Sequence, residues 1–266
     1  MATSGKLHTA QDNHAIKEAV ISFIVSPQII DPPSYQVLLN EGQSLHGIYH
    51  KFEPVKLKEV KIESSGLNNQ TVESIKDAGF KFIAFKEGKT SKIIQGLPQL
   101  RQALLTFNTV DYQNWNTFKE ESLSAAKKIA NFQPIYKVHA FSLMYIDEFY
   151  FENGNEYNPN ELFNLLESKN LPRGIEDSDF VDYNFNLRRH HEEKSYFENV
   201  SVKVFNEAQK KTIRIIGNLT FEIQAMPFAE VLESQDVTKY LDFSHNENKE
   251  MLKDILSPNI IKMIKL

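Results

Sequence analysis

Residues 211–225 alternate between apolar and polar side chains, and this alternation constrains the fold more than any other feature of the sequence. Successive side chains of a strand point to opposite faces of its sheet, so each parity occupies one face. Such a strand belongs to an antiparallel sheet with one face on a core and one in water. The apolar parity holds Ile213, Ile215, Gly217, Leu219, Phe221 and Ile223, and the mainly polar parity holds Thr212, Arg214, Asn218, Thr220, Glu222 and Gln224.

The rest of the chain supplies more strands and a few helices. Asp111 or Asn114 can cap a helix over 114–131, and Asn158-Pro159 begins a shorter one. Helical turns are expected over 34–49, a short helix over 72–76 and a C-terminal helix over 246–264. Strands are expected over 16–25, 54–63, 80–85, 92–95, 100–110, 135–151, 180–189 and 196–205.

The strand over 54–63 is irregular, because Val55 and Leu57 have one parity whereas Val60 and Ile62 have the other. A bulge near Glu59 or a position at the sheet edge would explain the change of parity. Together these patterns predict an α+β fold, with one or two extended antiparallel sheets and helices packed on one face. We expect a single domain over 1–266, and the order of elements suggests two related halves, 16–151 and 158–266.

Composition excludes several classes of site. The 266 residues contain no cysteine, which excludes disulfides, thiolate metal sites and a cysteine nucleophile. The net charge of −5 argues against a general coat for nucleic acid, although a local basic groove stays open. The polar start of the chain does not predict a secretory leader, and no stretch approaches the ~20 apolar residues of a membrane helix. We therefore expect a cytoplasmic protein without a membrane partner.

Three passages, at residues 18–23, 96–118 and 144–147, carry a resemblance to a known family, which spans most of the chain in the order of its elements. Glu18-Ala19-Val20-Ile21-Ser22-Phe23, a passage from Gly96 through Phe107-Asn108 to Trp115 and Phe118, and Met144-Tyr145-Ile146-Asp147 resemble motifs of a sporadically distributed family of bacterial proteins of about 250 residues. At the last motif, Met144 and Asp147 stand where the family has arginine and asparagine. The resemblance implies no activity and no catalytic residue. Its patchy distribution suggests an accessory or antiviral-defence role.

Two histidine clusters are candidate catalytic or metal sites. In the run from Arg188 to Lys194, His190 and Glu192 are two residues apart and share one face of a strand, with Arg188 nearby. A solvated strand end explains the same residues without any chemistry. His46 and His50 are four apart, a spacing that places two metal ligands on one side of a helix. Gly47 lies between them, and surface histidines are commoner than ligands.

Other polar groups are weaker candidates. His139 lies among apolar strand residues and is expected to be a partly buried, hydrogen-bonded histidine. Asp147, Glu148 and Glu152 form an acidic rim at a strand end that could hold a cation. Lys86, Lys89, Lys92 and Arg101 with Phe85 loosely resemble a single-strand nucleic-acid surface. Gly88-Lys89-Thr90 lacks the upstream glycine of a phosphate loop, because Ile83 stands there.

The sequence therefore favours a non-enzymatic binding protein that requires no cofactor. Its expected partner is another protein or a second copy of itself, as a homodimer. The alternatives are a metal-dependent hydrolase or nuclease that uses His190 and Glu192, and a nucleotide or nucleic-acid binder that uses a sheet face. Enzyme activity is left open.

Overall fold

The computed structural model describes residues 7–11, 14–65, 68–152, 157–165, 168, 171, 183–192, 195–207 and 210–266, and of residues 59–72 and 183 the backbone only. In this part of the chain, ten strands form one antiparallel sheet in the order β3-β4-β5-β6-β2-β7-β10-β9-β8, with β1 beside β7. The strands are β1 (Leu7–Thr9), β2 (Ile16–Ser26), β3 (Lys51–Ser65), β4 (Asn68–Lys86), β5 (Lys89–Pro98), β6 (Ala103–Thr109), β7 (Lys137–Phe151), β8 (Tyr183–His191), β9 (Tyr196–Glu207) and β10 (Lys210–Pro227). The helices are η1 (Pro32–Leu39), a 3-10 helix, and α1 (Trp115–Phe132), α2 (Pro159–Leu162), α3 (Phe228–Glu233), α4 (Gln235–Ile255) and α5 (Pro258–Met263). The predicted α+β fold with one antiparallel sheet is confirmed.

The connectivity repeats once along the chain. β2 opens a series whose last strand, β6, returns to pair with it, and α1 follows. β7 opens a second series whose last strand, β10, returns in the same way, and α3 and α4 follow. The two opening strands pair with each other at the middle of the sheet, where Ser22 lies opposite Ser142. The division into halves at 16–151 and 158–266 stays a prediction, since one continuous sheet joins both series.

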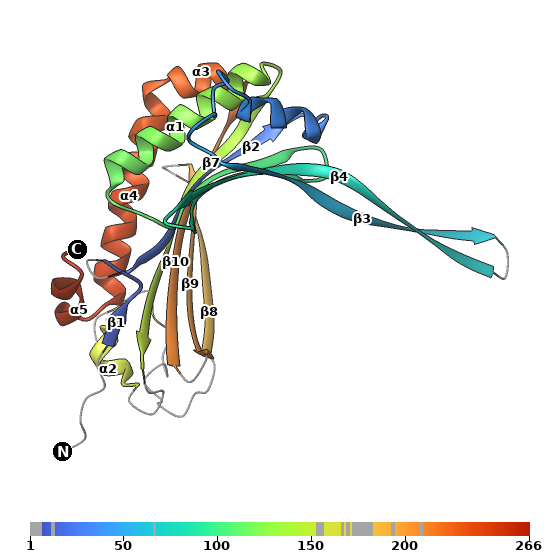
Figure 1. Cartoon of the computed structure of the whole chain (residues 1–266). Helices are drawn as coiled ribbons and strands as arrows, with labels where there is room; N and C mark the ends of the chain where they lie inside the picture. Colours follow the sequence, from blue (N-terminus) through green and yellow to red (C-terminus); the bar gives the residue numbers. More distant parts are fainter. Residues whose placement is uncertain are drawn as a thin grey trace.

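Helices α1, α3 and α4 cover one face of the sheet (Figure 1). The main core lies between them and the central strands, where Phe23, Phe141, Phe118 and Leu241 are buried together. A second cluster lies towards the end of β7 and the start of β10, where α4, α2 and α5 pack over residues such as Phe149 and Ile213. The helices therefore use only one side of the sheet.

The helix boundaries follow the capping residues. Asn114 accepts a hydrogen bond from the Thr117 backbone N–H, and α1 follows it as predicted. The C-terminal helix begins at Gln235 and not at 246, because Ser234 caps it through the Asp236 N–H. Its buried stripe contains the polar residues Ser244 and Asn248, which conceal the apolar periodicity in the sequence. The helix expected over 246–264 is divided, because α4 ends at Ile255 and α5 begins at Pro258.

β3 and β4 extend beyond the rest of the sheet as a long two-stranded arm (Figure 1). β3 lies at the sheet edge, which was one of the two explanations for its change of parity, and the register shift falls between Val55 and Lys56 and not near Glu59. The short helix expected over 72–76 is wrong, because these residues pair with β3, with Ile75 opposite Lys58. Pairing across the hairpin outweighs the weak helical preference of this polar segment.

Candidate functional site

We call the side of the sheet turned away from α1, α3 and α4 the open face. Of the helices that the structure describes, α1, α3 and α4 lie on the opposite side (Figure 1). Small hydroxyl side chains occupy its centre, because Ser22 pairs with Thr106 on β6 and with Ser142 on β7, and Ser142 pairs with Thr220 on β10. This row continues to Phe197 on β9 and His190 on β8. The centre of the face is thus polar but uncharged.

A hollow of about 350 Å³ lies in the middle of the open face. Its floor is tightly packed, since Val20 is 2% exposed and Thr106 8% exposed although both are on the face away from the helices. Among the residues that the structure describes, no charged residue lines it. The lining residues are Val20, Ser22, Ile24, Gln95, Leu104, Thr106, Asn108, Ala140, Phe141, Ser142, Met144, Asn218 and Thr220. The hollow therefore offers hydrogen bonds and apolar contact, without fixed charge.

Several polar atoms on this face have no hydrogen-bond partner among the described residues. They are the side-chain oxygens Thr106 Oγ1, Asn108 Oδ1, Asn218 Oδ1 and Ser201 Oγ, and all four are buried. Asn108 Nδ2 donates to Glu18 Oε1 at 2.7 Å, which orients the Asn108 carbonyl oxygen away from that carboxylate. Buried polar groups in native proteins are almost always satisfied. These four oxygens make the open face the candidate binding surface.

Cations and aromatic rings lie together on the part of the open face formed by β8, β9 and β10. The Arg188 guanidinium lies 5.0 Å from the centre of the Phe197 ring, and the His190 ring stacks on Phe197 at 4.4 Å. Arg214 lies 5.1 Å from the centre of the Phe205 ring. These pairs present flat, partly exposed surfaces beside positive charge.

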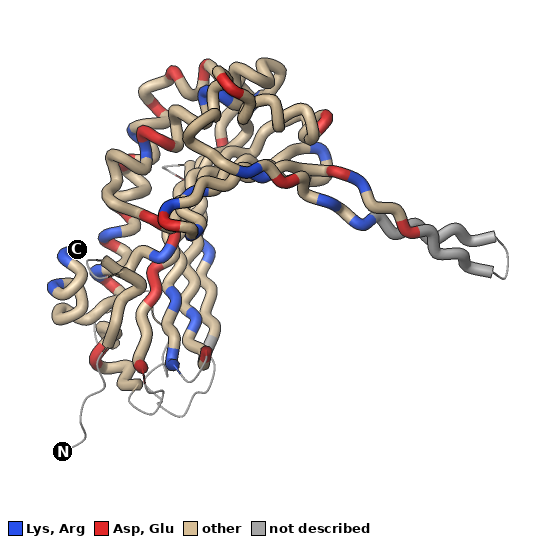
Figure 2. Tube along the Cα trace, in the orientation of Figure 1, with Lys and Arg blue, Asp and Glu red and all other residues tan. Residues whose placement is uncertain are grey.

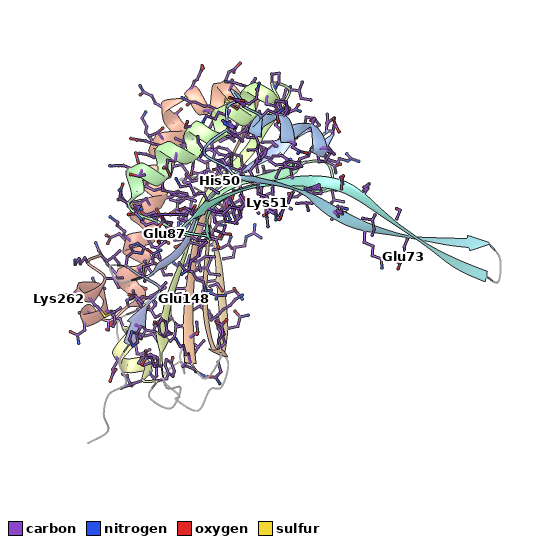
Figure 3. All side chains as sticks on the ribbon, in the orientation of Figure 1. His50, Lys51, Glu73, Glu87, Glu148 and Lys262 are labelled. Atoms are coloured by element: carbon purple, nitrogen blue, oxygen red, sulfur yellow. The ribbon has the colours of Figure 1, made fainter. Side chains whose placement is uncertain are left out.

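A carboxylate on β7 neutralises part of this charge. Glu148 (labelled in Figure 3) accepts hydrogen bonds from Lys17 Nζ at 2.7 Å and from Arg214 Nη2 at 2.6 Å. Its side chain is largely buried, which strengthens both contacts. Two cations hold one carboxylate, so a positive charge remains.

The cluster at Arg188–Lys194 divides between the two faces of the sheet. Arg188 and His190 are on the open face, whereas His191 bonds Glu198 at 3.0 Å on the other face. Glu192 follows the end of β8 and is exposed. Glu193 and Lys194, and residues 180–182 of the expected strand, lie outside the described residues. Among those that are described, no group of three or more His, Asp or Glu side chains is placed to hold a metal ion.

His46 and His50 lie in turns that follow η1. The helix expected over 34–49 is limited to Pro32–Leu39, so these two histidines do not share a helix face as their spacing suggested. The His46 ring donates from Nδ1 to the Leu39 carbonyl at 3.0 Å. His50 Nδ1 accepts from the Phe85 N–H at 3.1 Å. Their role as metal ligands stays a prediction.

Several of the other candidate groups have protein partners. Lys86 pairs with Asp111 at 2.6 Å, and Lys92 pairs with Glu121 at 2.7 Å. The His139 ring lies 2.6 Å from the Ser26 hydroxyl, as expected for a hydrogen-bonded histidine. The expected acidic rim is wrong, because Asp147 and Glu148 are neighbours on one strand and point to opposite faces.

Asp147 belongs instead to a buried polar network under the helices, which the sequence did not reveal. Its carboxyl group is 1% exposed, Oδ2 has no partner among the described residues, and burial raises its pKa to about 7. Nearby, the Tyr145 hydroxyl lies 2.9 Å from His245 Nδ1, and burial lowers the His245 pKa to about 4. The neutral imidazole shares this hydrogen bond with the Tyr145 hydroxyl and stacks on Trp115 at 4.8 Å. Trp115 in turn donates to Asp242 at 2.6 Å.

Comparisons with family models, with curated proteins and with solved structures found no match to this chain. The resemblance to the bacterial family therefore stays a prediction. Within the described residues, the model contains no helix with both the length and the apolar character needed to cross a membrane.

Proposed function

We propose that the protein is a non-enzymatic binding protein and that its ligand lies across the open face of the sheet. The observation that carries this proposal is the set of four buried, unpartnered oxygens on Thr106, Asn108, Asn218 and Ser201. Leaving a buried polar group unpaired costs about 1–3 kcal/mol, and a ligand that pairs with these oxygens recovers part of that energy.

The uncharged hollow supports binding over catalysis. A general acid or base needs a titratable group at the reacting atom, and the hollow is lined by hydroxyl, amide and apolar side chains only. The resemblance to a sporadically distributed bacterial family supports a setting in accessory or antiviral-defence functions. Three ligands can pair with the unpartnered oxygens of the open face: a second copy of the chain, another protein, and a nucleic acid.

Substitution at the centre of the open face tests the proposal. Ser142→Glu introduces a charged side chain into the hollow, where it blocks the hydroxyl groups and repels a polyanion, and Ser124→Glu makes the same change at an exposed position on α1. Each tagged variant is used to capture ligands from a bacterial lysate, with the protein, nucleic-acid and small-molecule fractions measured separately. We expect Ser142→Glu to lose a species that the wild type and Ser124→Glu retain, while all three proteins melt alike.

The proposal is wrong if Ser142→Glu is folded and captures the same species in the same amounts as the wild type. The hydrolase alternative is tested by alanine at both His190 and Glu192. Loss of a biological effect in that double variant, with unchanged melting and unchanged ligand capture, would favour chemistry over binding.

A further inference from the structure

We infer that the ligand of the open face is single-stranded nucleic acid, held over β8, β9 and β10; this inference rests on the proposed binding function. It starts from the charges on these three strands. Arg188, Lys203 and Arg214 come from three neighbouring strands, and Lys203 lies directly opposite Arg214. Figure 2 shows Lys and Arg gathered on this part of the sheet.

Carboxylates lie at the ends of this cationic region. Among the described residues on the same face of β8–β10, two are carboxylates. Glu207 is the last residue of β9, and Glu222 lies on β10, beyond the row of paired residues that runs from His190 through Phe197 to Thr220. Glu148 on β7 is already held by Lys17 and Arg214. The chain carries a net charge of −5, so a cationic surface here is a local feature that attracts a polyanion to one place.

Two aromatic rings lie within the cationic region. Phe197 and Phe205 are on the same face of β9, separated by about 26 Å at the rise of an extended strand. Each ring has an arginine over it, and His190 adds a second flat ring beside Phe197. Bases of a single strand stack on such rings, while the phosphates between them contact the cations.

The side chains between the two rings can hydrogen-bond to base edges. Asn199 and Ser201 lie between them on β9, and Asn184 and Asn186 lie opposite on β8. Amides donate and accept, so they pair with any base. An acidic protein segment would satisfy the cations but would leave the rings and amides without a matching group. A duplex keeps its bases stacked away from the rings.

Fluorescence anisotropy with labelled oligonucleotides of about 12 nucleotides, dT and rU, tests the inference, since single-strand sites span about 4–16 nucleotides. We expect the wild type to bind at low salt and Arg188→Glu/Lys203→Glu to bind at least about tenfold more weakly, with a smaller salt dependence. The matched control, Lys239→Glu/Lys253→Glu, makes the same change in net charge on exposed lysines of α4 and is expected to bind like the wild type. Phe197→Leu is expected to weaken binding without changing the salt dependence.

Three results would overturn the inference: no oligonucleotide binding by the wild type, equal weakening in both charge-reversal variants, or binding of a labelled glutamate-rich peptide in place of the oligonucleotides. If the oligonucleotides do not bind while Ser142→Glu still abolishes capture from lysate, the ligand class is wrong and the proposed binding function stands. If Ser142→Glu also has no effect on capture, the inference and the proposed function are both wrong.

Discussion

Asp147→Asn should stabilise the protein at every pH above about 4, and the gain should grow until about pH 7. The buried carboxyl group keeps its proton in the native state to a pKa of about 7, whereas the unfolded chain releases it near the ordinary value of 3.8. Between these two values the unfolded state binds fewer protons than the native state, so stability falls as the pH rises. The shift of about three pKa units corresponds to about 4 kcal/mol, lost progressively between about pH 4 and pH 7. Asparagine has the same shape and does not titrate.

Urea denaturation at about pH 5 and about pH 8 measures this difference. The asparagine variant is expected to gain about 3 kcal/mol relative to the wild type between the two pH values, because about two pH units of that range lie below the native pKa. Asp236→Asn is the control, since this aspartate lies at an exposed helix start and its side chain is in water in both states. A stability gap for Asp147→Asn that does not change with pH would refute the reasoning.

The remaining predictions concern packing, capping and a buried hydrogen bond. Gly217→Ala should destabilise the protein by about 1–3 kcal/mol, because its Cβ would lie 2.0 Å from Asn248 Oδ1 on α4. Asn114→Ala should cost about 1 kcal/mol by removing the cap of α1, as measured by chemical denaturation. Tyr35→Phe should cost about 1–3 kcal/mol, because the buried Tyr136 hydroxyl, 2.6 Å away, would lose its partner.

Each of these changes has a matched control. Adding Asn248→Ala to Gly217→Ala should recover part of the loss; independent, additive effects would rule out the proposed clash. Asn116→Ala, at an exposed position two residues after the cap, should leave stability nearly unchanged, and equal effects at 114 and 116 would argue against capping. For the hydrogen bond between Tyr35 and Tyr136, the double variant with phenylalanine at both positions should lose less stability than the sum of the losses in the two single variants.

The sequence predicted the sheet well, because the alternation of apolar and polar residues along a strand shows directly which face of the strand is buried. The strand over 211–225 lies within β10, and its apolar parity is the face under the helices. The start of α4 could not be predicted, since Ser244 and Asn248 are buried where an apolar residue was expected. The segment at 72–76 was predicted as a helix and is a strand, because its structure is determined by pairing with β3 and not by the helical preference of its own residues.

The open face was harder to predict than the fold. Ser22, Thr106 and Ser142 look like ordinary solvent-facing strand residues, and only the order of strands places them in one row. Arg188 and His190 were recognised as reactive side chains, but their partner Phe197 comes from the neighbouring strand. Asp147 was assigned to an acidic strand end because its sequence neighbours are acidic, whereas the alternation of the strand turns it under the helices.

The connectivity also has a consequence during synthesis of the chain. β2 cannot pair with β6 until β6 has been synthesised, since Val20 pairs with Asn108. In the same way, β7 cannot pair with β10 until Asn218, the partner of Met144, has been synthesised. Pairings this distant in sequence form slowly. While the ribosome adds the residues after α1, the edge of β2 that will receive β7 is unpaired, and such an edge attracts other strands. A chain interrupted between α1 and β7 would keep that edge exposed, so premature termination there should yield an aggregating fragment instead of a stable half.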